Sequence, residues 1–119
     1  MKKAYFALIV SVLIISCSQP ERNCQDYKTG TFSFKYIVDG EEKTGKFTRD
    51  DQYSVEYYDN KIDSATVKWL NDCEFVLQDV KMKSSVHMKI LSTTDNSYTF
   101  EYSLVGDAKK LQGTAIKTN

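Results

Sequence analysis

Cysteine and histidine are the side chains of this chain that could carry nucleophilic, redox or metal chemistry, and their number and spacing restrict it. The chain has three cysteines, Cys17, Cys24 and Cys73, and one histidine, His87. This set lacks the paired spacing of zinc ligands and has no C-x-x-C redox pair. His87 alternates with apolar neighbours, as an exposed strand residue does, and no G-x-S-x-G nucleophile motif is present. We therefore expect no enzymatic activity, no bound metal and no cofactor.

The start of the chain has the order of an export signal. Two lysines precede an uncharged apolar run, residues 4–15, which is too short to cross roughly 30 Å of hydrocarbon. The run ends in IISC, residues 14–17, which resembles the lipobox of bacterial lipoproteins. The resemblance implies removal of residues 1–16, acylation of Cys17 by chains such as palmitate, and a membrane anchor to which each buried CH₂ adds about 0.8 kcal/mol. An ordinary signal peptide with a chance cysteine, or an uncleaved anchor, is the alternative.

The polar residues 17–23 are expected to form a tether between the lipid and a single domain, residues 24–119. Ser18 replaces the aspartate that retains some bacterial lipoproteins at the inner membrane, and the tether is not strongly acidic. We expect an outer-membrane anchor and a domain on the periplasmic face.

Cys24 and Cys73 remain as a pair once Cys17 carries lipid. Disulfides persist in exported proteins, so a bridge is expected, with two buried free thiols as the alternative. A bridge closing a loop of about 50 residues would stabilise the domain by roughly 4 kcal/mol in the chain-entropy model.

The charge balance limits the partners. The whole chain has 16 basic and 16 acidic residues. Without residues 1–16 the count is 14 basic against 16 acidic, because Lys2 and Lys3 lie in the signal. A slightly acidic domain is not expected to bind nucleic acid, which requires a basic surface. The membrane, through the lipid on Cys17, is the expected partner.

Period-two alternation predicts an all-β domain. Residues 31–38 alternate strictly and are followed by Asp39-Gly40, a strong hairpin signal. Further alternating runs cover residues 43–49, 53–57, 64–70, 73–78, 86–90, 98–104 and 111–117. About eight strands with short connections predict an antiparallel meander, either a small lipocalin-like barrel or a curved sheet or sandwich.

The apolar sets of these runs predict the interior. One core should contain Phe32, Phe34, Tyr36, Trp69, Phe75, Leu77, Phe100 and Tyr102. If the interior holds a ligand, Trp69, Phe34, Tyr36, Phe100 and Tyr102 are the candidate lining residues. A plain core role is the alternative for Trp69. In residues 53–57, the alternation places Tyr53, Val55 and Tyr57 inward.

Two resemblances accompany this pattern. Gly30-Thr31-Phe32 is similar to the G-x-W start of lipocalins, with phenylalanine in place of tryptophan. More of the chain resembles short lipoproteins of Bacteroidota. These proteins carry a cysteine before a G-T-F strand, an arginine in the second strand and a W-x-x-D-C block. In this chain the corresponding positions are Cys24, residues 30–32, Arg49 and residues 69–73. Some members of that family are labelled a topoisomerase IV subunit, which neither the charge nor the length of this chain supports.

Other candidate sites have ordinary interpretations. Asp50, Asp51 and Asp59 could hold Ca²⁺ but are expected to be solvated turn carboxylates. Arg49 is expected at the surface, with an inward position beside a carboxylate as the alternative. Tyr53, Tyr57 and Tyr58 could form an aromatic binding surface, but most of them are expected in the core.

Two functions remain open. The first is a small binding module of the cell envelope that recognises a hydrophobic ligand, a glycan or an envelope protein. The second is a structural or accessory envelope protein without a small-molecule site. A cavity lined by aromatic residues and methionine would favour the first, and a filled interior with one exposed aromatic patch would favour the second.

Overall fold

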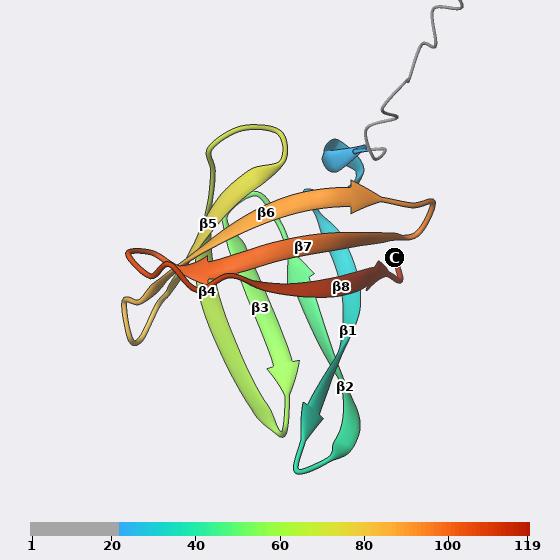
Figure 1. Ribbon diagram of the computed structural model, residues 1–119, viewed down its shortest axis with the longest axis vertical. Coiled ribbons are helices and arrows are strands. Elements are labelled where there is room, and N and C mark those ends of the chain that lie inside the picture. The colour runs from blue at the N-terminus through green and yellow to red at the C-terminus, as the bar shows by residue number, and fades with distance from the viewer. Residues whose placement is uncertain (1–21) are drawn as a thin grey trace, which may run out of the picture.

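The protein is an antiparallel β-barrel preceded by one short 3-10 helix, in a computed structural model that describes residues 22–119 (Figure 1). The elements are η1 (Cys24–Tyr27), β1 (Gly30–Val38), β2 (Glu41–Arg49), β3 (Tyr53–Tyr58), β4 (Lys61–Trp69), β5 (Glu74–Asp79), β6 (Ser85–Thr93), β7 (Ser97–Leu104) and β8 (Leu111–Lys117). The predictions for the export signal, for Cys17 and for most of the tether fall outside the described residues. Within residues 22–119, no helix is long and apolar enough to span a membrane.

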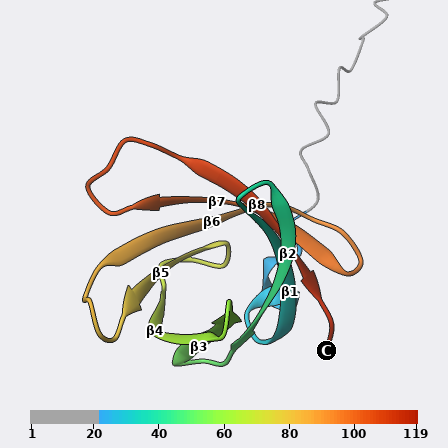
Figure 2. The ribbon, with the colours of Figure 1, turned by 90° about the horizontal axis from the view of Figure 1, so that it is seen from below.

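The eight strands pair in sequence order, and β8 returns to pair with β1 (Figure 2). The predicted antiparallel meander is therefore confirmed, and among the predicted architectures it is the closed barrel. Closure gives most backbone N–H and C=O groups a partner on a neighbouring strand, which removes the exposed edges of an open sheet.

An up-and-down barrel places alternate connections at opposite ends. Helix η1 lies at the end where β1 begins, together with the β2–β3, β4–β5 and β6–β7 connections; we call this the closed end. The other four hairpin connections surround the opposite end, which we call the mouth. In Figure 1 η1 is at the top, and the β1–β2 and β3–β4 hairpins are at the bottom.

The core is concentrated at the closed end. Its fully buried large side chains are Tyr98, Phe32, Phe75 and Ile90. Strand pairing brings Phe32 opposite Phe47, and their rings stack with centroids 4.8 Å apart. The predicted core members Phe34, Trp69, Leu77 and Phe100 are partly buried and pack against this cluster. The predicted inward set therefore shares one interior, but that interior is densely packed only in the half next to η1.

Arg49 is buried at the closed end, which corrects the expected surface position. The side chain is 3% exposed and donates hydrogen bonds to the carbonyls of Tyr27 and Lys28 and to the hydroxyl of Tyr98. Its guanidinium carbon lies 4.6 Å from the ring centroid of Phe75. No carboxylate pairs with it among the described residues. Its charge is tolerated inside because backbone carbonyls and aromatic faces replace water.

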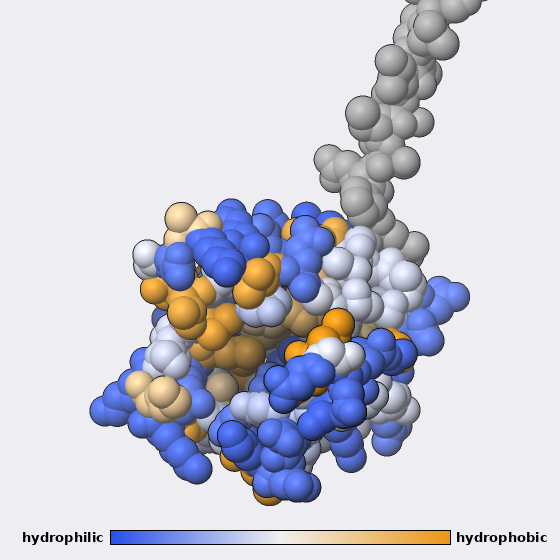
Figure 3. All heavy atoms as spheres, turned by 60° about the horizontal axis from the view of Figure 1, so that its bottom comes forward, coloured by the Kyte–Doolittle hydropathy of each residue, from blue (hydrophilic) through white to orange (hydrophobic). Residues whose placement is uncertain are grey.

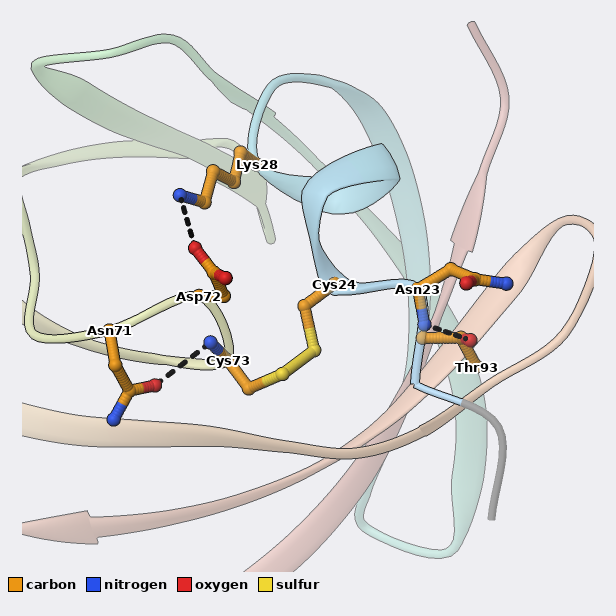
Figure 4. The surroundings of a disulfide bond; sticks show 7 residues. All are labelled: Asn23, Cys24, Lys28, Asn71, Asp72, Cys73 and Thr93. Carbon is orange, nitrogen blue, oxygen red and sulfur yellow. Dashed lines mark hydrogen bonds and ion pairs between the residues drawn. A yellow bond between two sulfur atoms is a disulfide. The ribbon is translucent and has the colours of Figure 1, made fainter.

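The predicted disulfide is confirmed and attaches η1 to the barrel (Figure 4). Cys24 in η1 bonds to Cys73 in the β4–β5 connection, with 5.2 Å between their Cα atoms. Beside it, the N–H of Asn23 donates to Thr93 Oγ1 at 2.9 Å, and Lys28 Nζ lies 3.6 Å from a carboxylate oxygen of Asp72. The closed end is thus covered by a helix that three interactions, with the β4–β5 connection and with β6, hold in place.

The inward face of β3 is the opposite of the predicted one. Tyr53 and Tyr57 are 47% and 42% exposed, whereas Ser54 is buried. The pairing of Phe47 with Glu56 fixes this register, because a residue opposite an inward phenylalanine also points inward. The strand alternates as predicted, but Ser54 and Glu56 face the interior, where both line the smaller hollow.

Candidate functional site

The mouth of the barrel opens into a cavity. It consists of two adjoining hollows of about 370 Å³ and about 290 Å³, and both are lined by Glu56, Leu77 and Val86. Figure 3 looks toward this end and shows apolar surface within the depression and polar residues around much of its edge. A cavity of this size in a small barrel can hold one small ligand.

Aromatic and aliphatic side chains form one wall of the larger hollow. This apolar wall comprises Phe34, Tyr36, Leu77, Val86, Met88, Phe100 and Tyr102. They project from β1, β5, β6 and β7, where alternate residues point inward. Each of two phenylalanines lies directly opposite a glycine on the neighbouring strand. Phe34 on β1 is opposite Gly45 on β2, and Phe100 on β7 is opposite Gly113 on β8.

The two glycines allow the rings to lie against the barrel wall. A β-carbon on residue 45 would lie 2.3 Å from the Phe34 ring, and one on residue 113 would lie 2.7 Å from the Phe100 ring. A side chain at either position would therefore displace the ring toward the lumen. The glycines therefore keep the larger hollow open. Glycine inside a strand often marks a place where another group approaches the backbone closely.

Acidic and tyrosine side chains form the other wall. We call Glu56, Tyr58, Asp63 and Asp79 the acidic wall; all four line the smaller hollow. Glu56 and Asp63 are directly opposite each other on β3 and β4, and the Tyr58 hydroxyl donates to Asp63 Oδ2 at 2.6 Å.

The acidic wall shifts the titration of its members. Burial, and then the nearby negative charge of Asp63, raise the pKa of Glu56. The hydrogen bond to Asp63 raises the pKa of Tyr58 to about 12, because the phenol proton stabilises that carboxylate. Two backbone N–H groups, of Met82 and Lys81, lower the pKa of Asp79. Asp79 therefore stays ionised to lower pH than a free aspartate does, whereas Glu56 takes up its proton at higher pH than a free glutamate does.

The barrel is incompletely paired beside the larger hollow. Strands β1 and β8 pair only from Phe32 to Phe34 and from Ala115 to Lys117. Toward the mouth the two strands separate, and Lys35, Gln112 and Thr114 line the opening. The cavity is thus accessible through the mouth and along this seam.

The predicted lining residues divide into two groups. Phe34, Tyr36, Phe100 and Tyr102 all line the larger hollow. Trp69 lies at the closed end instead, with its ring centroid 4.4 Å from that of Phe75 and with Lys28 Nζ 4.9 Å from its own centroid. It packs against the core and contributes to neither hollow of the cavity.

The remaining candidates do not assemble into a site. His87 is on the outer face, 3.3 Å from Glu74. Asp50 caps the β2–β3 turn by accepting the N–H groups of Gln52 and Tyr53, at the end of the barrel opposite Asp59. Within residues 22–119, no group of three His, Cys, Asp or Glu side chains is arranged to hold a metal ion.

The acidic wall and the two glycines were missed by the sequence analysis. Glu56, Asp63 and Asp79 resemble ordinary strand and turn carboxylates in the sequence. Strand pairing is the signal that places Glu56 and Asp63 inside the barrel: Glu56 is opposite the inward Phe47, and Asp63 is opposite Glu56. The sequence alone does not show this pairing.

Comparison of the chain with protein-family models, with curated proteins and with solved structures finds no match. The assignment of a function therefore depends on the cavity itself.

Proposed function

We propose that this protein is an envelope lipoprotein whose barrel binds a small, largely apolar molecule in the cavity at its mouth. The observation that carries the proposal is the larger hollow of about 370 Å³ with its apolar wall. Binding sites for small molecules are typically concave and mostly apolar, with a few polar groups that fix the orientation of the ligand. Here the acidic wall supplies the polar groups.

The arrangement of the two ends fits an anchored binding module. Residue 22 lies at the closed end, beside Cys24, whereas the cavity opens at the opposite end. A lipid on Cys17 would therefore attach the closed end to the membrane and present the mouth to the aqueous side. The lipobox-like residues 14–17 support the anchor, Ser18 in place of aspartate supports the outer membrane, and the weakly acidic tether supports the periplasmic face.

Exposed apolar side chains beside the mouth support ligand entry there. Ile37 on β1 is 75% exposed and Met82 in the β5–β6 connection is 80% exposed. Flexible and apolar side chains at an opening can cover the exposed part of a bound apolar molecule.

The test compares two tryptophan variants of the full chain in lipid nanodiscs, with empty discs as the blank. Val86→Trp places a large ring inside the cavity, and Val55→Trp places the same ring on the outer face of β3. We expect decanol to bind the wild type and Val55→Trp, and to bind Val86→Trp at least about tenfold more weakly. Equal binding to all three proteins, or none above the blank, would refute the proposed site.

The anchor is tested separately with Cys17→Ser. We expect this variant to lose its lipid and to leave the membrane fraction or to accumulate unprocessed. Normal processing and membrane retention of Cys17→Ser would contradict the lipoprotein assignment without affecting the cavity.

A further inference from the structure

The cavity contains an aromatic corner next to its negative charge. The rings of Tyr36 and Tyr58 are nearly perpendicular, with an interplanar angle of 84° and centroids 6.1 Å apart. Tyr36 lines the larger hollow and Tyr58 the smaller one, and Glu56 lines both. The two phenol rings and the carboxylate therefore meet where the hollows join.

Within residues 22–119, the carboxylates at this corner form no ion pair. None of the ion pairs there includes Glu56, Asp63 or Asp79. At the mouth, Lys43 lies 3.9 Å from Asp59 and Lys35 lies 3.2 Å from Glu42, and the charge of Lys81 contributes to the lowered pKa of Asp79. A positively charged group of a ligand would meet the Glu56 carboxylate, which no ion pair neutralises, in a partly desolvated site where Coulomb attraction is stronger than in water.

The surroundings favour an organic cation over a metal ion. Metal cations such as Ca²⁺ require six to eight oxygen ligands, and the carboxylates here do not form such a group. Perpendicular aromatic faces instead attract alkylated ammonium groups, whose charge is spread over apolar substituents. The apolar wall adjoining the corner, with Met88 and Phe100, fits the hydrocarbon part of the same molecule.

We infer that the ligand is an amphipathic alkylammonium compound, with its cationic head between Tyr36, Tyr58 and Glu56 and its chain along the apolar wall. This inference rests on the proposed function, since it names the ligand class of the same cavity. It assigns distinct tasks to the two walls: the apolar wall supplies affinity for the chain, and the acidic wall selects the sign of the head group.

The test is a series of ligands that share a decyl chain and differ in the head group. Decyltrimethylammonium, decanol and decanoate are titrated into the full chain in nanodiscs at neutral pH, with empty discs as the blank. We expect the ammonium compound to bind about tenfold more tightly than the alcohol, and the carboxylate more weakly than the alcohol.

Two substitutions locate the preference. Glu56→Gln should remove most of the tenfold advantage of the ammonium head over decanol. Tyr36→Leu should also reduce the advantage, because one aromatic face is lost. Glu74→Gln, which changes a strand carboxylate on the outer face, is the matched control and should leave all three affinities unchanged. Thermal unfolding verifies that each variant is folded.

The outcomes separate the two proposals. If no member of the series binds above the blank, the proposed function fails. If decanol binds but the three ligands bind equally, or if Glu56→Gln retains the ammonium preference, the inference alone is wrong. Such a ligand could be a membrane lipid or a soluble amine, and a lysophosphatidylcholine distinguishes the two. If it binds as tightly as decyltrimethylammonium, the ligand is a membrane lipid. If it binds more weakly, the ligand is a soluble amine without a phosphate.

Discussion

Phe100 on β7 lies directly opposite Gly113 on β8, and its ring occupies the space that a β-carbon on residue 113 would fill. The same relationship joins Phe34 on β1 to Gly45 on β2. Each ring is thereby held against the barrel wall instead of projecting into the centre. The cavity exists in part because these two rings, which are large enough to fill it, are accommodated over glycines.

Gly113→Ala should therefore reduce the cavity. The added methyl group, 2.7 Å from the present ring position, forces Phe100 toward the lumen. We expect weaker decanol binding and a loss of stability of about 1–3 kcal/mol, as overpacked cores show. Calorimetric titration and denaturant unfolding measure the two effects. The double variant Gly113→Ala/Phe100→Leu should recover part of the decanol affinity and part of the stability. If the effects of the two single substitutions on these quantities simply add, the proposed clash between the methyl group and the ring is wrong.

Arg49 is predicted to be essential for the closed end. Arg49→Met removes the donors to two backbone carbonyls and to the Tyr98 hydroxyl, and Arg49→Lys cannot replace them all. Leaving such buried acceptors unpaired should destabilise the barrel by roughly 2–4 kcal/mol. Urea unfolding of both variants provides the measurement. The control is Lys46→Met, on the exposed face of the same strand, which should change the free energy of unfolding by less than about 0.5 kcal/mol. An equally small effect of Arg49→Met would show that the buried guanidinium is dispensable.

The Cys24–Cys73 bridge should stabilise the domain by roughly 4 kcal/mol in the chain-entropy model, because it closes a long loop in the unfolded chain. Replacing both cysteines with serine should lower the melting temperature of the oxidised protein. Reduction of the wild type should lower it by a similar amount, whereas the double variant should not respond to reductant. A wild type whose melting temperature is the same with and without reductant would contradict this prediction.

Glu56 should make the barrel less stable as the pH rises. Its pKa is raised in the folded state, so the native protein binds the proton more tightly than the unfolded chain does. The contribution of this residue to the free energy of unfolding therefore falls as the pH rises from the ordinary glutamate pKa through the raised value. The other titratable groups lining the cavity are Lys35, Tyr36, Tyr58, Asp63, Asp79 and Tyr102.

Thermal melts of the wild type and Glu56→Gln at about pH 4 and about pH 7 provide the test. We expect the variant to melt higher than the wild type at neutral pH and the difference to shrink at acidic pH. A difference that grows on acidification would mean that the carboxylate is stabilised in the fold.

Much of the fold follows from local alternation in the sequence. Phe32, Phe34 and Tyr36 alternate with polar residues, and the turn at Asp39-Gly40 lies between two strands, so β1 and its hairpin could be predicted. The pairing of Cys24 with Cys73 could be predicted because only two cysteines remained once Cys17 was expected to carry lipid. These features depend on neighbouring residues or on counting, both of which a single sequence provides.

The cavity could not be predicted in the same way, because it depends on contacts between strands. Tyr53 and Tyr57 are more apolar than Ser54 and Glu56, so hydrophobicity alone places the wrong face of β3 inward. The correct face follows from the pairing with Phe47, and the tolerance for Glu56 follows from a lumen that is not filled. The buried position of Arg49 could not be predicted for a related reason. Its acceptors include backbone carbonyls, and no sequence pattern reveals that these lie beside it.

The position of a bound ligand tests the central claim most directly. A crystal structure of the protein grown with a decanol that carries bromine at the end of its chain would show the bromine by anomalous scattering. Our account predicts a single strong bromine peak inside the barrel, within contact of Phe34, Met88 and Phe100. Bromine peaks only on the outer surface, with the lumen empty, would contradict it.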